Sequence, residues 1–137
     1  MSLTALVNAR VLLPGGLRDN VVIVIESDRI VGIETDAPRD AQRVDLEGAL
    51  LLPGLIDTQV NGGGGRLFND DPSVDTIRTI AAAHRRYGTT GLLPTLISDD
   101  PPAIARAIAA VDAAIKAGVP GVLGVHIEGP FINPVRR

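Results

Sequence analysis

From Leu51 onward, strand-length apolar runs alternate with helix-length amphipathic segments, and this alternation most restricts the fold. The three apolar runs cover 51–61, 89–98 and 121–127. They are too short and too apolar for surface helices, so each indicates a buried parallel strand. The order strand, helix, strand, helix, strand is typical of consecutive βαβ units. The sequence therefore predicts an α/β fold with a parallel sheet over residues 51–137.

Both predicted helices carry start and stop signals. The first begins after Asp71-Pro72-Ser73 and ends near Gly88; the second begins at Asp100-Pro101-Pro102 and ends near Gly118. The residues at helical spacing are Val74, Ile77, Ala81, His84 and Tyr87 in the first helix, and Ile104, Ile108, Val111 and Ile115 in the second. Pro94 cannot donate to a strand ladder, so the middle strand is expected to contain a bulge or to end early.

The first fifty residues have a different pattern. Short β-branched segments at 5–13, 20–26 and 29–34 are separated by turn residues. This spacing predicts antiparallel hairpins. We therefore expect a small β-domain over residues 1–50.

Composition excludes several classes of partner. The net charge is −3 and the pI is near 5.2, which provides no basic surface for nucleic acid. The chain has no cysteine, so disulfides and thiolate metal sites are excluded. A membrane span or signal peptide is not expected either, and the predicted location is the cytoplasm.

Polar residues follow two of the apolar runs. Gln59 and Asn61 lie two apart and share one strand face, as do His126 and Glu128. In (β/α) barrels the C-terminal ends of the strands carry the chemistry, so these four residues predict one shared site. From the residues alone, Glu128 is either a metal ligand or a salt-bridged or capping carboxylate. Gln59 and Asn61 could instead satisfy buried backbone, and His126 could be an interior hydrogen-bonded residue.

Five segments together resemble the amidohydrolase superfamily, and within it the N-acetylglucosamine-6-phosphate deacetylases. They are Pro53-Gly54-Leu55-Ile56-Asp57, Gln59-Val60-Asn61, Tyr87-Gly88-Thr89-Thr90, Leu93-Pro94-Thr95-Leu96 and His126-Ile127-Glu128-Gly129-Pro130-Phe131. The superfamily usually has His-x-His after the first barrel strand. Here Gln59-Val60-Asn61 stands in that place, as in many of these deacetylases.

The resemblance implies a fold and a metal centre. Residues 51–137 would form the first three strands and two helices of a (β/α)8 TIM barrel, and residues 1–50 would be part of a β-sandwich domain. Glu128 would be a ligand of one divalent metal ion, zinc or iron(II). Gln59, Asn61 and His126 would orient water or neighbouring groups by hydrogen bonds. Because amide oxygens are weak ligands, a mononuclear centre is expected.

The resemblance also implies a reaction. The family removes acetate from N-acetylglucosamine 6-phosphate to give glucosamine 6-phosphate, and the full-length enzyme is expected to be a homodimer. The family's base is an aspartate on a late barrel strand. No residue here matches that base, which would lie beyond Arg137, and Asp57 looks structural.

The length of the chain limits this interpretation. A complete barrel takes roughly 250 residues, whereas this chain has 137. We expect an incomplete chain that is inactive alone and is not an independently stable monomer. Two alternatives remain: another amidohydrolase acting on a cyclic amide or another N-acetyl sugar, and an inactive fragment that serves as a scaffold module.

The glycine run at 62–65 has two interpretations. Consecutive glycines can form a phosphate cradle, but no Lys-Ser or Lys-Thr follows them. A flexible loop at the mouth of the site is the preferred interpretation. Arg66, which follows, could approach a sugar phosphate, although a solvated arginine is the preferred prediction.

Overall fold

The fold was analysed in a computed structural model that describes residues 2–131. The chain divides into two compact units, Met1–Pro53 and Gly54–Arg137. Among residues 2–131, neither helix has the length and apolar composition that a membrane-spanning segment requires.

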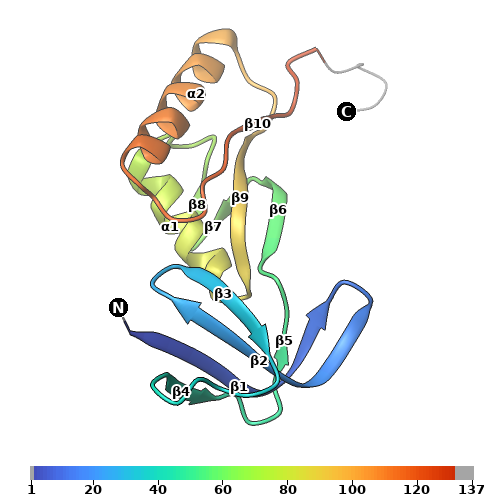
Figure 1. Cartoon of the computed structure of the whole chain (residues 1–137). Helices are drawn as coiled ribbons and strands as arrows, with labels where there is room; N and C mark the ends of the chain where they lie inside the picture. The colour runs from blue at the N-terminus through green and yellow to red at the C-terminus, as the bar shows by residue number, and fades with distance from the viewer. Residues whose placement is uncertain (1, 132–137) are drawn as a thin grey trace. The chain divides into compact units, whose positions relative to one another are not determined.

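The N-terminal unit is a five-stranded sheet (Figure 1). Its strands are β1 (Leu3–Leu13), β2 (Gly16–Glu26), β3 (Arg29–Glu34), β4 (Gln42–Asp45) and β5 (Leu50–Leu51). β1 pairs antiparallel with β2, and β2 with β3, so the predicted hairpins are confirmed. β4 and β5 pair parallel with β1. The apolar run predicted to begin a barrel strand at Leu51 is therefore divided, because Leu51 belongs to this sheet.

The C-terminal unit contains a three-stranded parallel sheet in the order β10-β9-β6. Its main elements are β6 (Leu55–Val60), α1 (Val74–Arg85), β9 (Thr89–Leu96), α2 (Pro101–Lys116) and β10 (His126–Ile127). A small hairpin of β7 (Gly62–Gly63) and β8 (Arg66–Leu67) lies between β6 and α1. The predicted alternation of strands and helices is thus confirmed.

The third predicted strand, 121–127, is shorter than expected. Only His126–Ile127 form a strand, and Val122 contributes an isolated bridge to Leu92. Gly121 has a φ of 84°, which is not extended backbone. The run therefore begins in a turn, and a strand forms only at its end.

Both helices begin at the predicted caps. The Ser73 side chain accepts a hydrogen bond from the Thr76 N–H, and the Asp100 side chain accepts one from the Ala103 N–H. Gly88 has a φ of 94°, which suits a residue just past a helix end. The predicted limits of the helices are therefore correct to within a few residues.

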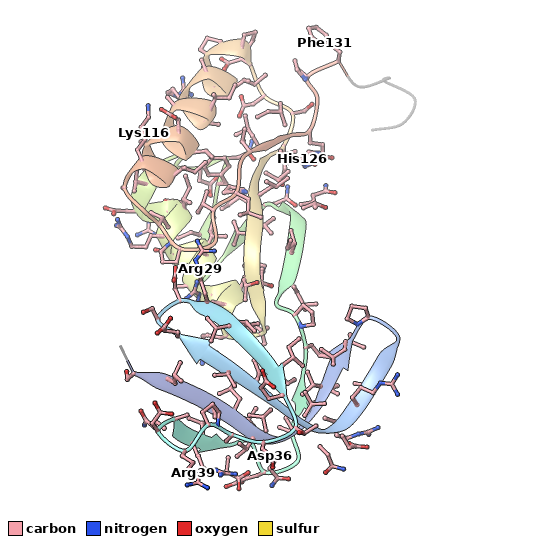
Figure 2. The ribbon with its side chains drawn as sticks, viewed as in Figure 1. Arg29, Asp36, Arg39, Lys116, His126 and Phe131 are labelled. Carbon is pink, nitrogen blue, oxygen red and sulfur yellow. The ribbon has the colours of Figure 1, made fainter. Side chains whose placement is uncertain are left out.

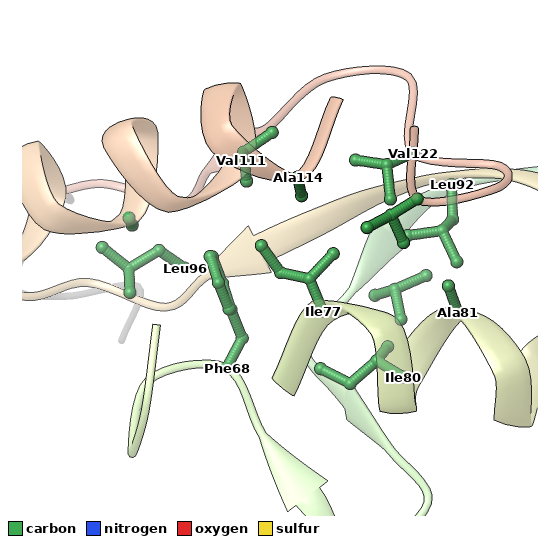
Figure 3. Close-up of a cluster of buried hydrophobic side chains, with 12 residues drawn as sticks. Phe68, Ile77, Ile80, Ala81, Leu92, Leu96, Val111, Ala114 and Val122 are labelled. Carbon is green, nitrogen blue, oxygen red and sulfur yellow. The ribbon is translucent and has the colours of Figure 1, made fainter. Parts of the chain in front are cut away.

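The core of the C-terminal unit lies between its sheet and its two helices (Figure 3). Its largest fully buried side chains include Phe68, Ile77, Ile80, Leu92 and Leu96. Val125 and Ile127 pack against the same cluster, which places the intervening His126 on the opposite face of the chain.

The predicted apolar stripes of the helices need two corrections. Ile108 and Ile115 are exposed, and the buried residues of α2 are Ala103, Ala107, Val111 and Ala114. Small side chains let the helix backbone approach the sheet, so alanine occupies the contact stripe and the larger residues lie beside it. Tyr87 lies beyond the end of α1 and is 83% exposed, so it is not part of the stripe.

Candidate active site

The ends of β6 and β10 bring two predicted site residues into contact. The side-chain amide of Gln59 donates a hydrogen bond from Nε2 to Glu128 Oε2 at 3.3 Å. Glu128 follows directly after β10, and its N–H donates to the Leu96 carbonyl at the end of β9. The carboxylate is therefore held where three parallel strands end, which is the position predicted from the sequence.

A bulge in β6 determines where Gln59 lies. The pairing of β6 with β9 shifts register between Asp57 and Val60, so β6 contains an extra residue opposite the segment before Pro94. The Asp57 carboxylate accepts a hydrogen bond from the Gln59 N–H at 3.1 Å and so stabilises the backbone at this point. The irregularity expected in the middle strand at Pro94 lies instead in its neighbour β6, because β9 continues through Pro94 to Leu96. Asp57 has a structural contact.

The Thr95 side chain, on β9, connects this strand to both of its neighbours, β6 and β10. Its hydroxyl accepts a hydrogen bond from the Val60 N–H at 2.9 Å and donates one to the Leu93 carbonyl at 3.1 Å. The same oxygen lies 3.3 Å from His126 Nδ1. Figure 2 labels His126 on β10, beside β9. Thr95 could not be recognised as a site residue from the sequence, because a buried threonine in a strand carries no functional signal of its own.

Asn61 is placed differently from Gln59. Its side-chain Nδ2 is buried and has no hydrogen-bond partner among the described residues. Its backbone carbonyl accepts a hydrogen bond from the Phe68 N–H at 2.8 Å. A buried donor without a partner is rare and costly. The structure therefore joins Gln59 directly to Glu128 and connects His126 to β9 through Thr95. It leaves the Asn61 side-chain Nδ2 available for a further partner.

The glycine run lies in the connection between β6 and α1, as predicted, but it forms a regular hairpin and not an irregular loop. Gly64 and Gly65 have φ values of 61° and 79°, which suit a two-residue hairpin turn. The Gly62 carbonyl lies 3.0 Å from His84 Nε2 on α1. A side chain on Gly63 would approach His84 Cδ2 to 2.9 Å. The glycines thus permit close packing of the hairpin on α1. Arg66 is exposed, as predicted.

Asn69 is a second residue whose role has no signal in the sequence. Its side chain donates to the Ile97 carbonyl and accepts from the Ile97 N–H, each at 2.9 Å. It also donates to the Asp99 carboxylate at 3.3 Å. The asparagine continues the β9 ladder with its side chain and fixes the segment after the hairpin to the end of this strand.

Two hydroxyl groups and one carboxylate near the start of α1 form a local hydrogen-bond network. The Thr76 hydroxyl donates to the Asp71 carboxylate at 2.7 Å, and the Ser73 hydroxyl donates to it at 2.9 Å. These hydrogen bonds, that of Thr76 foremost, lower the pKa of Asp71 from its ordinary value. The network supports the helix start and takes no part in the contact between Gln59 and Glu128.

The described residues supply only part of a metal site. They contain no group of three or more His, Cys, Asp or Glu side chains that could hold an ion together. Glu128 is half-buried and has a neutral hydrogen-bond donor beside it, which suits a single carboxylate ligand. Further ligands for an ion would have to come from residues outside those described.

The sequence and the architecture both match known deacetylases. The chain is 40% identical over 133 residues to an N-acetylgalactosamine-6-phosphate deacetylase of Shewanella sp. (strain ANA-3), covering 94% of this chain and 34% of the relative. It is 30% identical over 131 residues to an N-acetylglucosamine-6-phosphate deacetylase of Haemophilus influenzae, again covering 94% and 34%. The chain is homologous to the N-terminal part of these deacetylases. No protein-family model matches it.

Solved structures agree with this relationship to the deacetylases. The N-acetylglucosamine-6-phosphate deacetylase from Pasteurella multocida superposes with a TM-score of 0.92 at 32% identity, over 98% of this chain and 36% of that chain. A variant of the Mycobacterium smegmatis deacetylase, in complex with N-acetyl-D-glucosamine-6-phosphate, superposes with a TM-score of 0.85 at 32% identity, over 99% and 35%. This deacetylase homologue therefore spans about a third of the length of the relatives it matches.

Proposed function

We propose that the gene product carrying this chain removes the acetyl group from N-acetylglucosamine 6-phosphate, releasing acetate and glucosamine 6-phosphate. The observation that carries this proposal is the contact between Gln59 and Glu128 at the ends of parallel strands. It lies within an architecture that matches a solved deacetylase with a TM-score of 0.92. A carboxylate held by an amide at such a strand end suits a hydrolytic metal centre.

Glu128 is proposed as a protein ligand of one divalent metal ion, zinc or iron(II). A carboxylate that acts together with imidazoles suits either ion. Gln59 and Asn61 carry neutral amides, which are weak ligands, and this supports one metal ion per chain rather than two. When bound, the ion would act as a Lewis acid toward the amide carbonyl of the substrate.

The other site residues are proposed to orient groups. The Gln59 amide holds one oxygen of the Glu128 carboxylate in place, so the carboxylate loses less rotational freedom when it binds an ion. The unpartnered Nδ2 of Asn61 is a donor that a substrate oxygen or a water molecule could satisfy. No residue of this chain matches the family's aspartate base, so the described residues provide binding and orientation only.

The wider architecture is part of the same proposal. We infer that the β10-β9-β6 sheet with α1 and α2 is the first part of a (β/α)8 barrel, and that the N-terminal sheet is part of a β-sandwich. The second inference is supported by an apolar groove within the N-terminal unit, lined by Leu6, Val11, Leu12, Leu13, Pro14, Ile23, Ile25, Ile30, Ile33, Leu51, Leu52 and Pro53. A homodimer in the cytoplasm completes the proposal, on the basis of resemblance and composition.

N-acetylgalactosamine 6-phosphate is a second candidate substrate. The relative from Shewanella, which bears that name, is 40% identical to this chain, whereas the Haemophilus relative named for the glucosamine compound is 30% identical. The two sugars differ only in the orientation of one hydroxyl group. A pocket that hydrogen-bonds this hydroxyl would discriminate between them strongly.

Acetate release from both sugar phosphates tests the proposal. The purified gene product should deacetylate at least one of them, and N-acetylglucosamine without phosphate should be a much poorer substrate. A higher kcat/KM for the galactosamine compound would favour the second candidate. Hydrolysis of a cyclic amide, with neither sugar phosphate deacetylated, would favour another amidohydrolase.

A further inference from the structure

Thr95 lies at the centre of the hydrogen bonds that join the three strands of the C-terminal sheet. Its side chain is fully buried, on the middle strand β9. Its hydroxyl contacts Val60 on β6 and His126 on β10. Val60 directly follows Gln59, and His126 lies two residues before Glu128. One hydroxyl group therefore lies between both strands that carry the proposed site.

The hydrogen on this hydroxyl can be assigned from its neighbours. The Val60 N–H can only donate and the Leu93 carbonyl can only accept, whereas His126 Nδ1 can do either. If the hydroxyl donated to His126, Thr95 Oγ1 and the Leu93 carbonyl oxygen would lie 3.1 Å apart without a hydrogen between them. If it donates to Leu93 instead, all three contacts become hydrogen bonds. Because unpaired buried polar groups are costly, the second arrangement is favoured.

We propose that Thr95 is a positioning residue that holds His126 as the tautomer with hydrogen on Nδ1. This tautomer leaves Nε2 with a free electron pair, so Nε2 is the acceptor of the ring. On the proposed function, His126 then accepts a hydrogen bond from a donor group of the substrate or from a water molecule. The assignment of the tautomer itself rests on geometry alone.

The same hydroxyl also replaces part of the strand ladder. At the register shift in β6, the Val60 N–H donates to Thr95 Oγ1, which in turn donates to the Leu93 carbonyl. The hydroxyl thus bridges the bulge that places Gln59. Loss of this hydroxyl would release both the β6 backbone beside Gln59 and the His126 ring, whereas serine at this position would retain the bridge.

Nitrogen-15 NMR of the histidine rings tests the assignment, and His84 provides an internal reference. The carbonyl of Gly62 can only accept, so His84 must carry hydrogen on Nε2, the opposite of His126. The ring signals are assigned by comparing the gene product with its His84→Gln and His126→Gln variants, each of which lacks one of the two rings. His126 should show a protonated Nδ1 and a bare Nε2 in the unmodified protein and in Thr95→Ser, but not in Thr95→Val. Hydrogen on Nε2 of His126 in the unmodified protein would overturn the proposal.

Kinetics separates positioning from simple support of the fold. Thr95→Val should lower kcat/KM about 10-fold, and Thr95→Ser should restore most of it. Thr76→Val is the matched control, because it also removes a buried threonine hydroxyl but lies on α1 and bonds to Asp71. It should leave the His126 tautomer and kcat/KM unchanged. An equal loss in both valine variants would overturn the positioning role, whereas the predicted tautomers without deacetylase activity would refute only the proposed function.

Discussion

The Gln59 side chain and the Glu128 carboxylate, 69 positions apart in the sequence, meet at a donor–acceptor distance of 3.3 Å. The contact joins β6 to the residue directly after β10, and β6 and β10 are the two outer strands of the β10-β9-β6 sheet. It connects the part of the chain where the superfamily usually has His-x-His to the carboxylate proposed as a metal ligand.

Glu128→Gln should lower metal affinity while preserving the fold. The change removes the negative charge and keeps nearly the same volume, so a metal ligand is lost without a cavity. Elemental analysis after dialysis should show at least a 10-fold loss of bound metal. Glu34→Gln, on β3 of the N-terminal unit, should retain its metal. Normal metal content in Glu128→Gln would show that the carboxylate is structural.

The gene product should hold close to one metal ion per chain. The amides of Gln59 and Asn61 are weak ligands where two imidazoles would be strong ones. Elemental analysis alongside a protein concentration from amino-acid analysis measures the ratio. Two tightly held ions per chain would contradict the mononuclear proposal.

Phe68→Ala should destabilise the C-terminal unit by about 3–5 kcal/mol, the usual cost of removing a buried aromatic ring. Phe68 is fully buried against the core beneath the sheet, whereas Tyr87 is 83% exposed. Tyr87→Ala should therefore change stability by less than about 0.5 kcal/mol. Denaturant unfolding of both variants measures the difference, and equal effects would mean that the Phe68 ring is not in the core.

Asp71 should contribute to stability in a pH-dependent way. Hydrogen bonds from Thr76 and Ser73 lower its pKa below the ordinary value of 3.8. The folded state therefore favours the ionised form, and the contribution is present above about pH 4. It is lost as the pH falls through the lowered pKa.

Asp71→Asn tests this linkage. The difference in unfolding free energy between the original protein and the variant should be largest near neutral pH and should shrink in acid. Asp70→Asn, at the neighbouring position outside this hydrogen-bond network, is the control. A difference for Asp71→Asn that does not change between pH 7 and pH 3 would rule out the linkage.

Much of the fold could be predicted because its signals are local. Ser73 and Asp100 are capping residues directly before apolar periodic segments, and both cap as predicted. Glu128 could be predicted as a strand-end carboxylate for the same reason. The buried stripe of α2 could not, because isoleucine is more apolar than alanine and only the close approach to the sheet selects Ala107 and Ala114.

The remaining site residues depend on contacts between distant segments. Thr95 acquires its role from the β6 bulge and from His126, and Asn69 from the backbone of Ile97. Neither residue type signals such a role along the chain. The glycine run could be interpreted either as a loop or as a cradle until its packing on His84 was visible.

Acetate release from N-acetylglucosamine 6-phosphate, measured side by side for the gene product, Glu128→Gln and Glu34→Gln, shows whether Glu128 supports the proposed reaction. We expect one acetate and one free amine per substrate consumed, at similar rates in the original protein and Glu34→Gln. The rate in Glu128→Gln should be lower by about 100-fold or more, because loss of the ligand removes the ion that polarises the amide. Full activity in Glu128→Gln, or no acetate from either N-acetylhexosamine 6-phosphate in the presence of zinc or iron(II), would contradict this expectation.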